Sequence, residues 1–482
     1  MLITRRTLFE SGSLMAVGSA IWPRWMPRLV FRKDGTNPTG DILVVVFARG
    51  GYDGLNMVIP YGEEGNYFNR RRNIAIPAPD STATRKGVNL DGFFGMHPAL
   101  ALPDEGRWKQ WYDEGLLAMV HAVAMKDETR SHFDAMDFME RGTPGEKTRP
   151  DGWLGRHLAT VATSNGSPFR AVGLGTQLQA SLRGPVPAVA LQSIAEFHLQ
   201  GRQAEIARFQ QHLQSLYSGE GWLDSQGQST FAALDLLQQS VTPGAYRPSN
   251  GADYAPALGF GTGLAQVAQL VKADVGLEVA CVDIGGWDTH ANQVNADDTT
   301  EGNHANLLRY LSKGITAFIT DLRDHFDPRS SDKQGITIVV MSEFGRRAGQ
   351  NGSTGTDHGH GNVMFVFGRG VNGGKVYGRW PGLADDQLNR GDLDMTTEYR
   401  DVLGEVLSKR ANNAQVSEVF PGHAFSFLGL ARKDAGTVPT PVEPTATSVP
   451  PTTPAPTVAP PTAAPTTTPA RKIYLPWTTN GS

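Results

Sequence analysis

The chain has 482 residues, with 44 Lys and Arg against 48 Asp and Glu, a net charge of -4, 55 glycines, 31 prolines and one cysteine. This nearly balanced charge gives no basic surface of the kind that binds nucleic acid or anionic membranes, so neither is expected as a partner. The single Cys281 excludes an internal disulfide and any Cys-x-x-Cys metal or redox site. The length is sufficient for a large folded core.

The start of the chain, residues 1–38, has the pattern of an export signal. Arg5 and Arg6 precede a Leu-Phe pair, and a weakly apolar segment follows over residues 11–22. That segment is far shorter than the ~20 residues needed to span a bilayer. The pattern resembles a twin-arginine signal, which implies export of a folded protein by the twin-arginine translocase. We therefore expect an extracytoplasmic protein (periplasm, cell surface or secreted) that is not integral to the membrane; the alternative is an amphipathic helix.

The end of the chain is expected to form a disordered Pro/Thr-rich linker over residues 433–470 and a short segment over 471–482. Residues 437–470 contain 11 prolines and 11 threonines and almost no large apolar side chains. Such a composition cannot bury enough surface to fold, and its prolines favour an extended polyproline II backbone. The last segment contains Leu475-Pro476-Trp477-Thr478, a degenerate form of a sortase signal. It is interpreted either as a tag for cell-wall or surface association or as plain disorder.

Residues 39–432 are expected to form one α/β domain. Continuous apolar runs predict buried strands over residues 42–47, 116–125, 277–284, 336–341 and 363–367. Apolar residues three and four apart predict helices over residues 206–216, 231–239, 264–273, 304–325 and 397–407. Strands that alternate with helices indicate a mostly parallel central sheet flanked by helices. Ligands of such sheets bind beyond the carboxyl ends of the strands.

Two of the predicted strands end in glycine-rich loops that carry polar side chains. The first strand leads to Arg49-Gly-Gly-Tyr-Asp53, and the strand over residues 277–284 leads to Gly-Gly-Trp-Asp288-Thr-His290. For Asp53 alone a plain turn explains the composition equally well. Because two strands end alike, these carboxylate and imidazole groups are candidate metal ligands.

The strand over residues 336–341 is followed by Glu343 and Arg346, and a loop later by Asp357-His358-Gly-His360-Gly. Two imidazoles and a carboxylate within four residues, separated by glycine, are typical of a chelating loop for a divalent transition metal. The alternative is a polar loop whose histidines bond neighbouring carbonyls.

Ser131 is the candidate nucleophile. It stands before a helical pattern that runs through Met139, where it would be the N-cap of a helix. The free N–H groups of such a helix end favour an anion such as phosphate. Capping alone explains the serine equally well.

Together these segments resemble the family called domain of unknown function 1501, which groups with the alkaline phosphatase and sulfatase superfamily. The segments that carry the resemblance lie in order between about residues 41 and 430: 47–56, 90–99, 131–133, 152–156, 286–290, 342–346 and 357–361. The resemblance implies an alkaline-phosphatase-like sheet, divalent metals held by Asp and His, and a nucleophile that accepts phosphoryl or sulfuryl groups.

Carried over by residue, the resemblance implies that Asp53 is the first-strand metal aspartate, that Asp288 and His290 form the later metal pair and that Ser131 is the nucleophile. One departure is Glu343-Phe344-Gly345, which stands where the superfamily usually has Asp-His-Gly. The missing histidine would then be replaced from the later loop by Asp357, His358 or His360. A sulfatase of the formylglycine type is not expected, because Cys281 lacks the Cys-x-Pro-x-Arg pattern.

We therefore expect an exported metal-dependent hydrolase of phosphate or sulfate esters, acting on a small-molecule or glycan ester. The metal would be zinc, manganese, calcium or magnesium. In this hypothesis Arg49, Arg346 or His132 neutralises the developing oxyanion charge. The alternative is a surface-tethered, non-catalytic binding protein that keeps the fold, which the stalk and Phe344 favour, whereas the clustered donors favour the enzyme. The expected metal ligands are Asp53, Asp288, His290, Glu343, Asp357, His358 and His360.

Overall fold

The structure is a computed structural model that describes residues 40–63, 65–197, 203–240, 246–330 and 333–433. The expected export signal and both C-terminal segments lie outside these residues, apart from residue 433. No helix in the described ranges is both long enough and apolar enough to cross a membrane.

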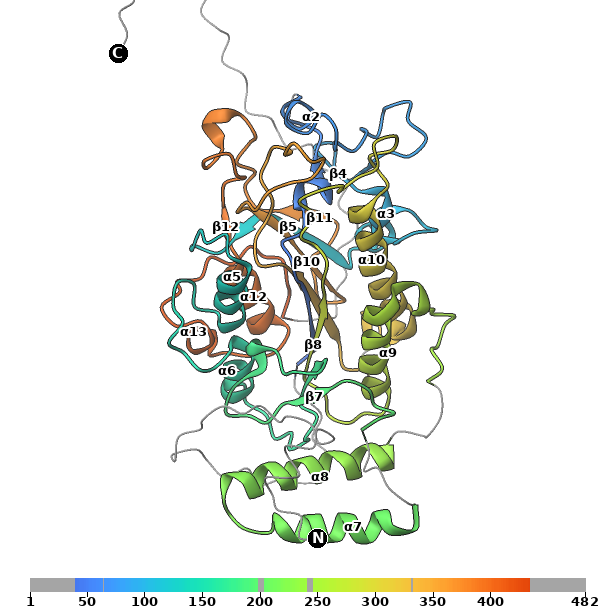
Figure 1. The fold of residues 1–482 in the computed structure, drawn as a ribbon, viewed down its shortest axis with the longest axis vertical. Helices are drawn as coiled ribbons and strands as arrows, with labels where there is room; N and C mark the ends of the chain where they lie inside the picture. The colour runs from blue at the N-terminus through green and yellow to red at the C-terminus, as the bar shows by residue number, and fades with distance from the viewer. Residues whose placement is uncertain (1–39, 64, 198–202, 241–245, 331–332, 434–482) are drawn as a thin grey trace, which may run out of the picture. The chain divides into compact units, whose positions relative to one another are not determined.

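A nine-stranded sheet forms the centre of the folded region (Figure 1). Its strands run in the order β11-β5-β10-β9-β1-β8-β6-β7, with β12 beside β5. Every pairing is parallel except those of β10 with β5 and with β9. The predicted mostly parallel sheet is therefore confirmed. The strands are β1 (Ile42–Ala48), β5 (Leu117–Ala124), β6 (Ala171–Leu174), β7 (Val189–Leu191), β8 (Val279–Ile284), β9 (Ile336–Met341), β10 (Asn362–Gly368), β11 (Lys375–Tyr377) and β12 (Thr397–Glu398).

Helices cover both faces of this sheet, as Figure 1 shows. On one face lie α5 (His132–Arg141), α6 (Trp153–Thr160), α12 (Tyr399–Lys409) and α13 (Val416–Val419), and on the other lie α3 (Pro98–Ala101), α9 (Leu258–Lys272) and α10 (Asn303–Asp321). Successive residues of β1 pack against the helices on opposite faces of the sheet, because side chains along a strand alternate between its two faces. Val45 packs in the cluster that includes α5, α6 and α12, whereas Val44 packs in the cluster that includes α9 and α10.

The remaining elements lie around this core. A small antiparallel sheet has the order β2-β4-β3. The pattern over residues 304–325 is divided in the structure into α10 and α11, and the helix expected from residue 397 begins at Tyr399 because the two residues before it belong to β12. The further elements are β2 (Val58–Pro60), β3 (Val88–Asn89), β4 (Phe94–Met96), α2 (Asn66–Arg70), α4 (Trp108–Asp113), α7 (Gln203–Leu216), α8 (Trp222–Ser240) and α11 (Arg323–Phe326).

The antiparallel strand β10 determines which loops meet. The parallel strands β1, β8 and β9 all end at one edge of the sheet. Because β10 runs the opposite way beside β9, its first residues lie at that same edge. The loop of residues 357–361, which precedes β10, therefore reaches the edge where the loops after β1, β8 and β9 begin.

Candidate metal centre

Four side chains from three segments converge at this edge of the sheet. His132 is the first residue of α5, Asp288 and His290 follow β8, and His358 precedes β10. The Nε2 atom of His358 lies 2.9 Å from Nε2 of His132 and 2.9 Å from Nε2 of His290. Asp288 Oδ1 lies 3.1 Å from Nε2 of His358, 3.1 Å from Nε2 of His290 and 3.4 Å from Nε2 of His132. Of these, His132, Asp288 and His358 offer mutually close ligand atoms for one metal ion.

The second ring nitrogen of each histidine faces an acceptor. Nδ1 of His132 lies 2.7 Å from Glu343 Oε1, and Nδ1 of His290 lies 3.3 Å from Asp357 Oδ1. Nδ1 of His358 lies 2.8 Å from the backbone carbonyl oxygen of Arg130. Carbonyl and carboxylate oxygens only accept, so in each case Nδ1 carries the proton. A neutral imidazole then has a bare lone pair on Nε2, the tautomer that metal-binding histidines adopt.

These lone pairs face one another, and a cation between them would relieve their repulsion. Two unprotonated nitrogens at 2.9 Å repel unless a proton or a cation lies between them. Ligand atoms bound to one ion at about 2.0–2.1 Å are roughly 2.9–3.4 Å apart for coordination angles between about 90° and 109°. The separations of Asp288 Oδ1 from the three Nε2 atoms, and of His358 Nε2 from the other two, lie between 2.9 and 3.4 Å. The set of His132, Asp288 and His358 therefore has the donors and the spacing for a single metal ion, and His290 lies beside it against Asp288 and His358.

Two buried charged residues orient this cluster. Glu343 follows β9, is 1% exposed, and its Oε1 also accepts the N–H of Gly50 at 2.8 Å. The guanidinium of Arg346 donates to Asp288 Oδ1 at 2.7 Å and to the backbone carbonyls of Gly51 and Thr356. Glu343 thereby holds the ring of His132, and Arg346 holds the carboxylate of Asp288. Phe344 packs its ring against those of His132 and His358, at 4.7 and 4.9 Å between centroids, and so forms a wall of the centre.

The charges around the centre favour an ionised Asp288. Partial burial raises the pKa of this carboxyl, but the hydrogen bond and charge of Arg346 outweigh burial and lower the pKa to about 2. For His132, the hydrogen bond to Glu343 raises the pKa, whereas burial lowers the pKa of His358. Asp288 is thus an anionic donor at neutral pH.

Several residues predicted from sequence lie beside the cluster with other partners. Asp357 contacts His290, and Glu343 contacts His132, so both support ligand histidines instead of supplying the converging atoms. His360 Nε2 bonds the carbonyl oxygen of Met125 at 2.8 Å and does not join the cluster.

The two arginines expected to neutralise an oxyanion are engaged elsewhere. Arg49 pairs with Glu140 at 2.8 Å and with Asp283 at 3.0 Å. The guanidinium N–H groups of Arg346 donate hydrogen bonds to loop carbonyls and to Asp288. The acceptors of Arg49 lie on α5 and β8, whereas the buried guanidinium of Arg346 takes its acceptors from loops.

Ser131 caps α5. Its hydroxyl accepts the N–H of Asp134 at 3.4 Å, and its own N–H donates to Thr129 Oγ1 at 3.2 Å. The predicted N-cap position is therefore present, and it places this hydroxyl one residue before the candidate ligand His132.

Asp53 has a different environment from the one expected of a metal ligand. It is fully buried and forms an ion pair with Arg71 at 2.5 Å, and it also accepts from Gln293 Nε2 at 2.6 Å. Burial raises the pKa of this carboxyl, but the charge of Arg71 outweighs burial and lowers it. Arg71 also bonds the backbone carbonyls of Arg347 and Ala348. The Asp53–Arg71 pair thus joins the loop after β1 to the loop after β9, and no local pattern in the sequence points to Arg71.

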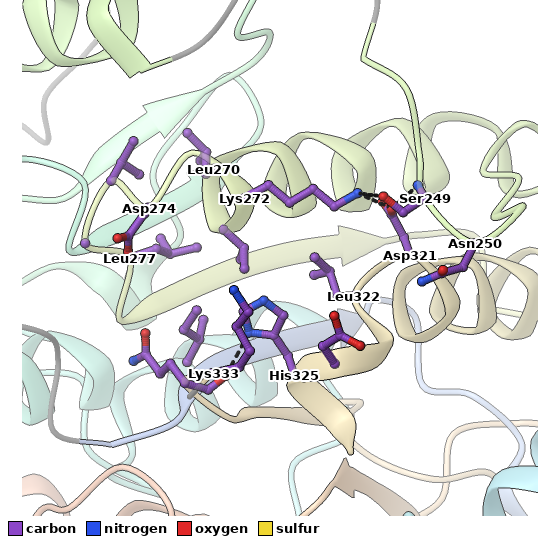
Figure 2. A pocket seen from close by; sticks show the side chains of 16 residues that line it. Ser249, Asn250, Leu270, Lys272, Asp274, Leu277, Asp321, Leu322, His325 and Lys333 are labelled. Atoms are coloured by element: carbon purple, nitrogen blue, oxygen red, sulfur yellow. Dashed lines mark hydrogen bonds and ion pairs between the residues drawn. The ribbon is translucent and has the colours of Figure 1, made fainter. Parts of the chain in front are cut away.

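A separate cavity of about 470 Å³ lies at the opposite edge of the sheet. Its lining includes Ile42 at the start of β1 and residues just before β8 and β9. Figure 2 shows Lys272 of α9 extending to Asp321 and Ser249, and the Lys272–Ser249 bond measures 2.9 Å. The buried carboxylate of Asp321 in this cavity is already paired with Lys272. The cavity therefore differs from the candidate metal centre both in its position and in its chemistry.

An α/β domain with a His/Asp centre at the carboxyl edge of its sheet is the class of protein that these observations define. The family described as "Protein of unknown function (DUF1501)" matches residues 118–412, and the chain belongs to that family. No curated protein matches the chain.

Solved structures give distant similarities. The chain is similar to Ps i-CgsB in complex with k-i-k-neocarrahexaose, with 10% identity over 80% of this chain and 75% of that chain and a TM-score of 0.33. It is similar to alkaline phosphatase from the Antarctic bacterium TAB5, with 10% identity over 69% and 92% of the two chains and a TM-score of 0.29. It is also similar to the PH0037 protein from Pyrococcus horikoshii, with 11% identity over 78% and 98% and a TM-score of 0.29.

Replacing Arg71 by Met is expected to destabilise the protein by about 3–5 kcal/mol, because it leaves the buried carboxylate of Asp53 without its counter-charge. Urea unfolding followed by circular dichroism measures the change. Arg72→Met is the matched control, because Arg72 is exposed beside it, and it should change stability by less than about 0.5 kcal/mol. Equal unfolding midpoints for the two variants would contradict the role assigned to the ion pair.

Proposed function

We propose that the protein is a metal-dependent hydrolase of phosphate or sulfate esters. One observation carries the proposal: the Nε2 atoms of three histidines and Asp288 Oδ1 converge while every opposite ring nitrogen is held by an acceptor. Structural histidines in a polar loop do not need this arrangement, whereas metal ligands do.

The residues that would hold the ion are His132, Asp288 and His358, with His290 beside them. Imidazole donors suit zinc and related transition metals, whereas calcium and magnesium prefer oxygen ligands. Zinc is therefore our first choice and manganese the second. When bound, such an ion polarises an ester oxygen and lowers the pKa of water.

The position of α5 supports an anionic substrate. His132 is the first residue of this ten-residue helix, so its first-turn N–H groups lie beside the ligand cluster. The positive end of a helix favours phosphate or sulfate groups. The resemblance to phosphate- and sulfate-transferring enzymes points to the same ester classes.

Ser131 is our candidate nucleophile because it adjoins His132. In the first half of the reaction its oxygen bonds to phosphorus or sulfur, the ester bond to the alcohol breaks, and the serine proton passes to the departing alcohol oxygen. Water then cleaves the seryl ester, which restores the hydroxyl and releases phosphate or sulfate.

Export by the twin-arginine translocase and surface association through residues 433–482 belong to the same proposal. They rest on Arg5, Arg6 and the Pro/Thr-rich composition alone. An extracytoplasmic enzyme with one cysteine would depend on packing, buried ion pairs and its bound ion for stability.

Protein purified from an exporting host is expected to contain one transition-metal ion per chain and to hydrolyse at least one of a phosphomonoester, a phosphodiester and a sulfate ester. His358→Ala should abolish both metal retention and hydrolysis. Glu343→Gln changes the group that accepts the Nδ1 proton of His132 and leaves the acceptors of the other histidines in place. It should weaken metal binding by about 10–100-fold. Elemental analysis, zinc titration and ester assays give these values.

His212→Ala is the control, because His212 is exposed on α7 away from the centre, and it should change neither metal content nor rate. A wild-type protein that contains no metal and hydrolyses none of the esters would contradict the proposed hydrolase function. A metal-loaded protein that hydrolyses none of the esters would favour the alternative of a surface-tethered binding protein.

Ser131→Ala is expected to lower kcat by at least about a hundredfold, as loss of an activated nucleophile does, with metal content unchanged. It should also cost about 1 kcal/mol of stability through the lost helix cap. Ser131→Thr keeps both a hydroxyl and a capping oxygen and serves as the matched variant. If Ser131→Ala lowers stability but leaves kcat intact, the serine is only a cap and water is the direct nucleophile.

A further inference from the structure

Phe133 is an unusually exposed aromatic residue beside the metal centre. Its exposure is 84%, above that of Leu258 at 58% and Phe427 at 41%, and the highest among the large hydrophobic side chains in the described part of the chain. It directly follows the ligand His132. A phenylalanine left in water forgoes the stabilisation of burial, and its ring is free to contact a ligand.

The helix α5 directs this ring away from the core. Ala135, Phe138 and Met139 form the buried side of α5. Successive residues in a helix are about 100° apart around its axis, so Phe133 and His132 leave the same turn in different directions. His132 points into the centre, and Phe133 leaves the same turn of α5 toward solvent.

The polar groups next to Phe133 are already paired. Lys147 bonds Asp134, and Arg130 pairs with Asp392 at 2.5 Å. The charged groups nearest to Phe133 in the chain therefore have partners, and Phe133 itself offers an exposed, flat apolar ring. Such a face stacks on aromatic rings and on the apolar faces of sugar rings.

We propose that Phe133 is a specificity-determining residue that stacks on a ring in the alcohol part of the ester. This inference rests on the proposed function for the position of the ester group at the metal. It selects esters of aryl or glycosyl alcohols over esters of small acyclic alcohols.

The test is equilibrium binding to the zinc-loaded protein, which does not require turnover. Phenylphosphonate, the C-glucosyl phosphonate (glucose with a C–P bond in place of the ester) and methylphosphonate are titrated by calorimetry, because none of them contains an ester bond that the enzyme could cleave. Wild-type protein should bind phenylphosphonate or the C-glucosyl phosphonate more tightly than methylphosphonate, and the two ring ligands tell an aryl from a glycosyl preference. Phe133→Ala should weaken the ring ligands by about five- to tenfold and leave methylphosphonate unchanged.

Phe133→Trp should retain the preference because it keeps a stacking face. Phe209→Ala, at an exposed phenylalanine of α7 distant from α5 in Figure 1, should leave all three affinities unchanged. Zinc content and unfolding midpoint should be the same in every variant.

Equal affinities of wild-type protein for all three ligands, or no binding of any, would overturn this inference. So would an unchanged ring preference in Phe133→Ala. If the ring preference is present and lost in Phe133→Ala while no ester is hydrolysed, the stacking role stands and the hydrolase function falls.

Discussion

The buried guanidinium of Arg346 is the constraint on which the candidate centre depends. It is bonded at once to the loop after β1 through Gly51, to the loop after β8 through Trp287 and Asp288, and to the loop before β10 through Thr356. A buried charge is tolerated only when its donors are satisfied, so each loop is fixed by the need to supply an acceptor. A lysine offers no rigid fork that reaches several acceptors in one plane, so it could not join these loops in the same way. The position of Asp288 follows from this arrangement.

The sheet topology explains why ligands come both from before and from after strands. His132, Asp288 and His290 follow strands that end at the carboxyl edge, as expected for a parallel sheet. His358 precedes a strand, and it reaches the same edge because β10 is antiparallel to β9 and β5. One reversed strand therefore completes the set of candidate ligands, and it does so without a long connection.

The sequence predicts the main strands, the helices that alternate with them and the loops that carry the ligands, because apolar runs and glycine-rich strand ends are local signals. It does not predict which donor of a loop faces inward. His358 and His360 are two residues apart, yet the first points to Asp288 and the second to the carbonyl of Met125. Asp53 has a strand-end position but is neutralised by Arg71, whose side chain arrives only through the tertiary fold. Direction and distant partners are properties of packing, and spacing does not contain them.

The hydrogen bonds around the centre also determine how it competes for a cation. Because Glu343, Asp357 and the Arg130 carbonyl occupy the Nδ1 protons, a proton can reach each ring only at Nε2, the atom that binds metal. Protonation and metal binding are therefore mutually exclusive at the histidines. Despite partial burial, Arg346 lowers the pKa of Asp288 to about 2, so this carboxylate stays negatively charged at every pH at which an imidazole gains or loses its proton. The carboxylate then attracts a cation at all of these pH values. A metal ion binds when the imidazoles are neutral, and protons replace it when the imidazoles are protonated.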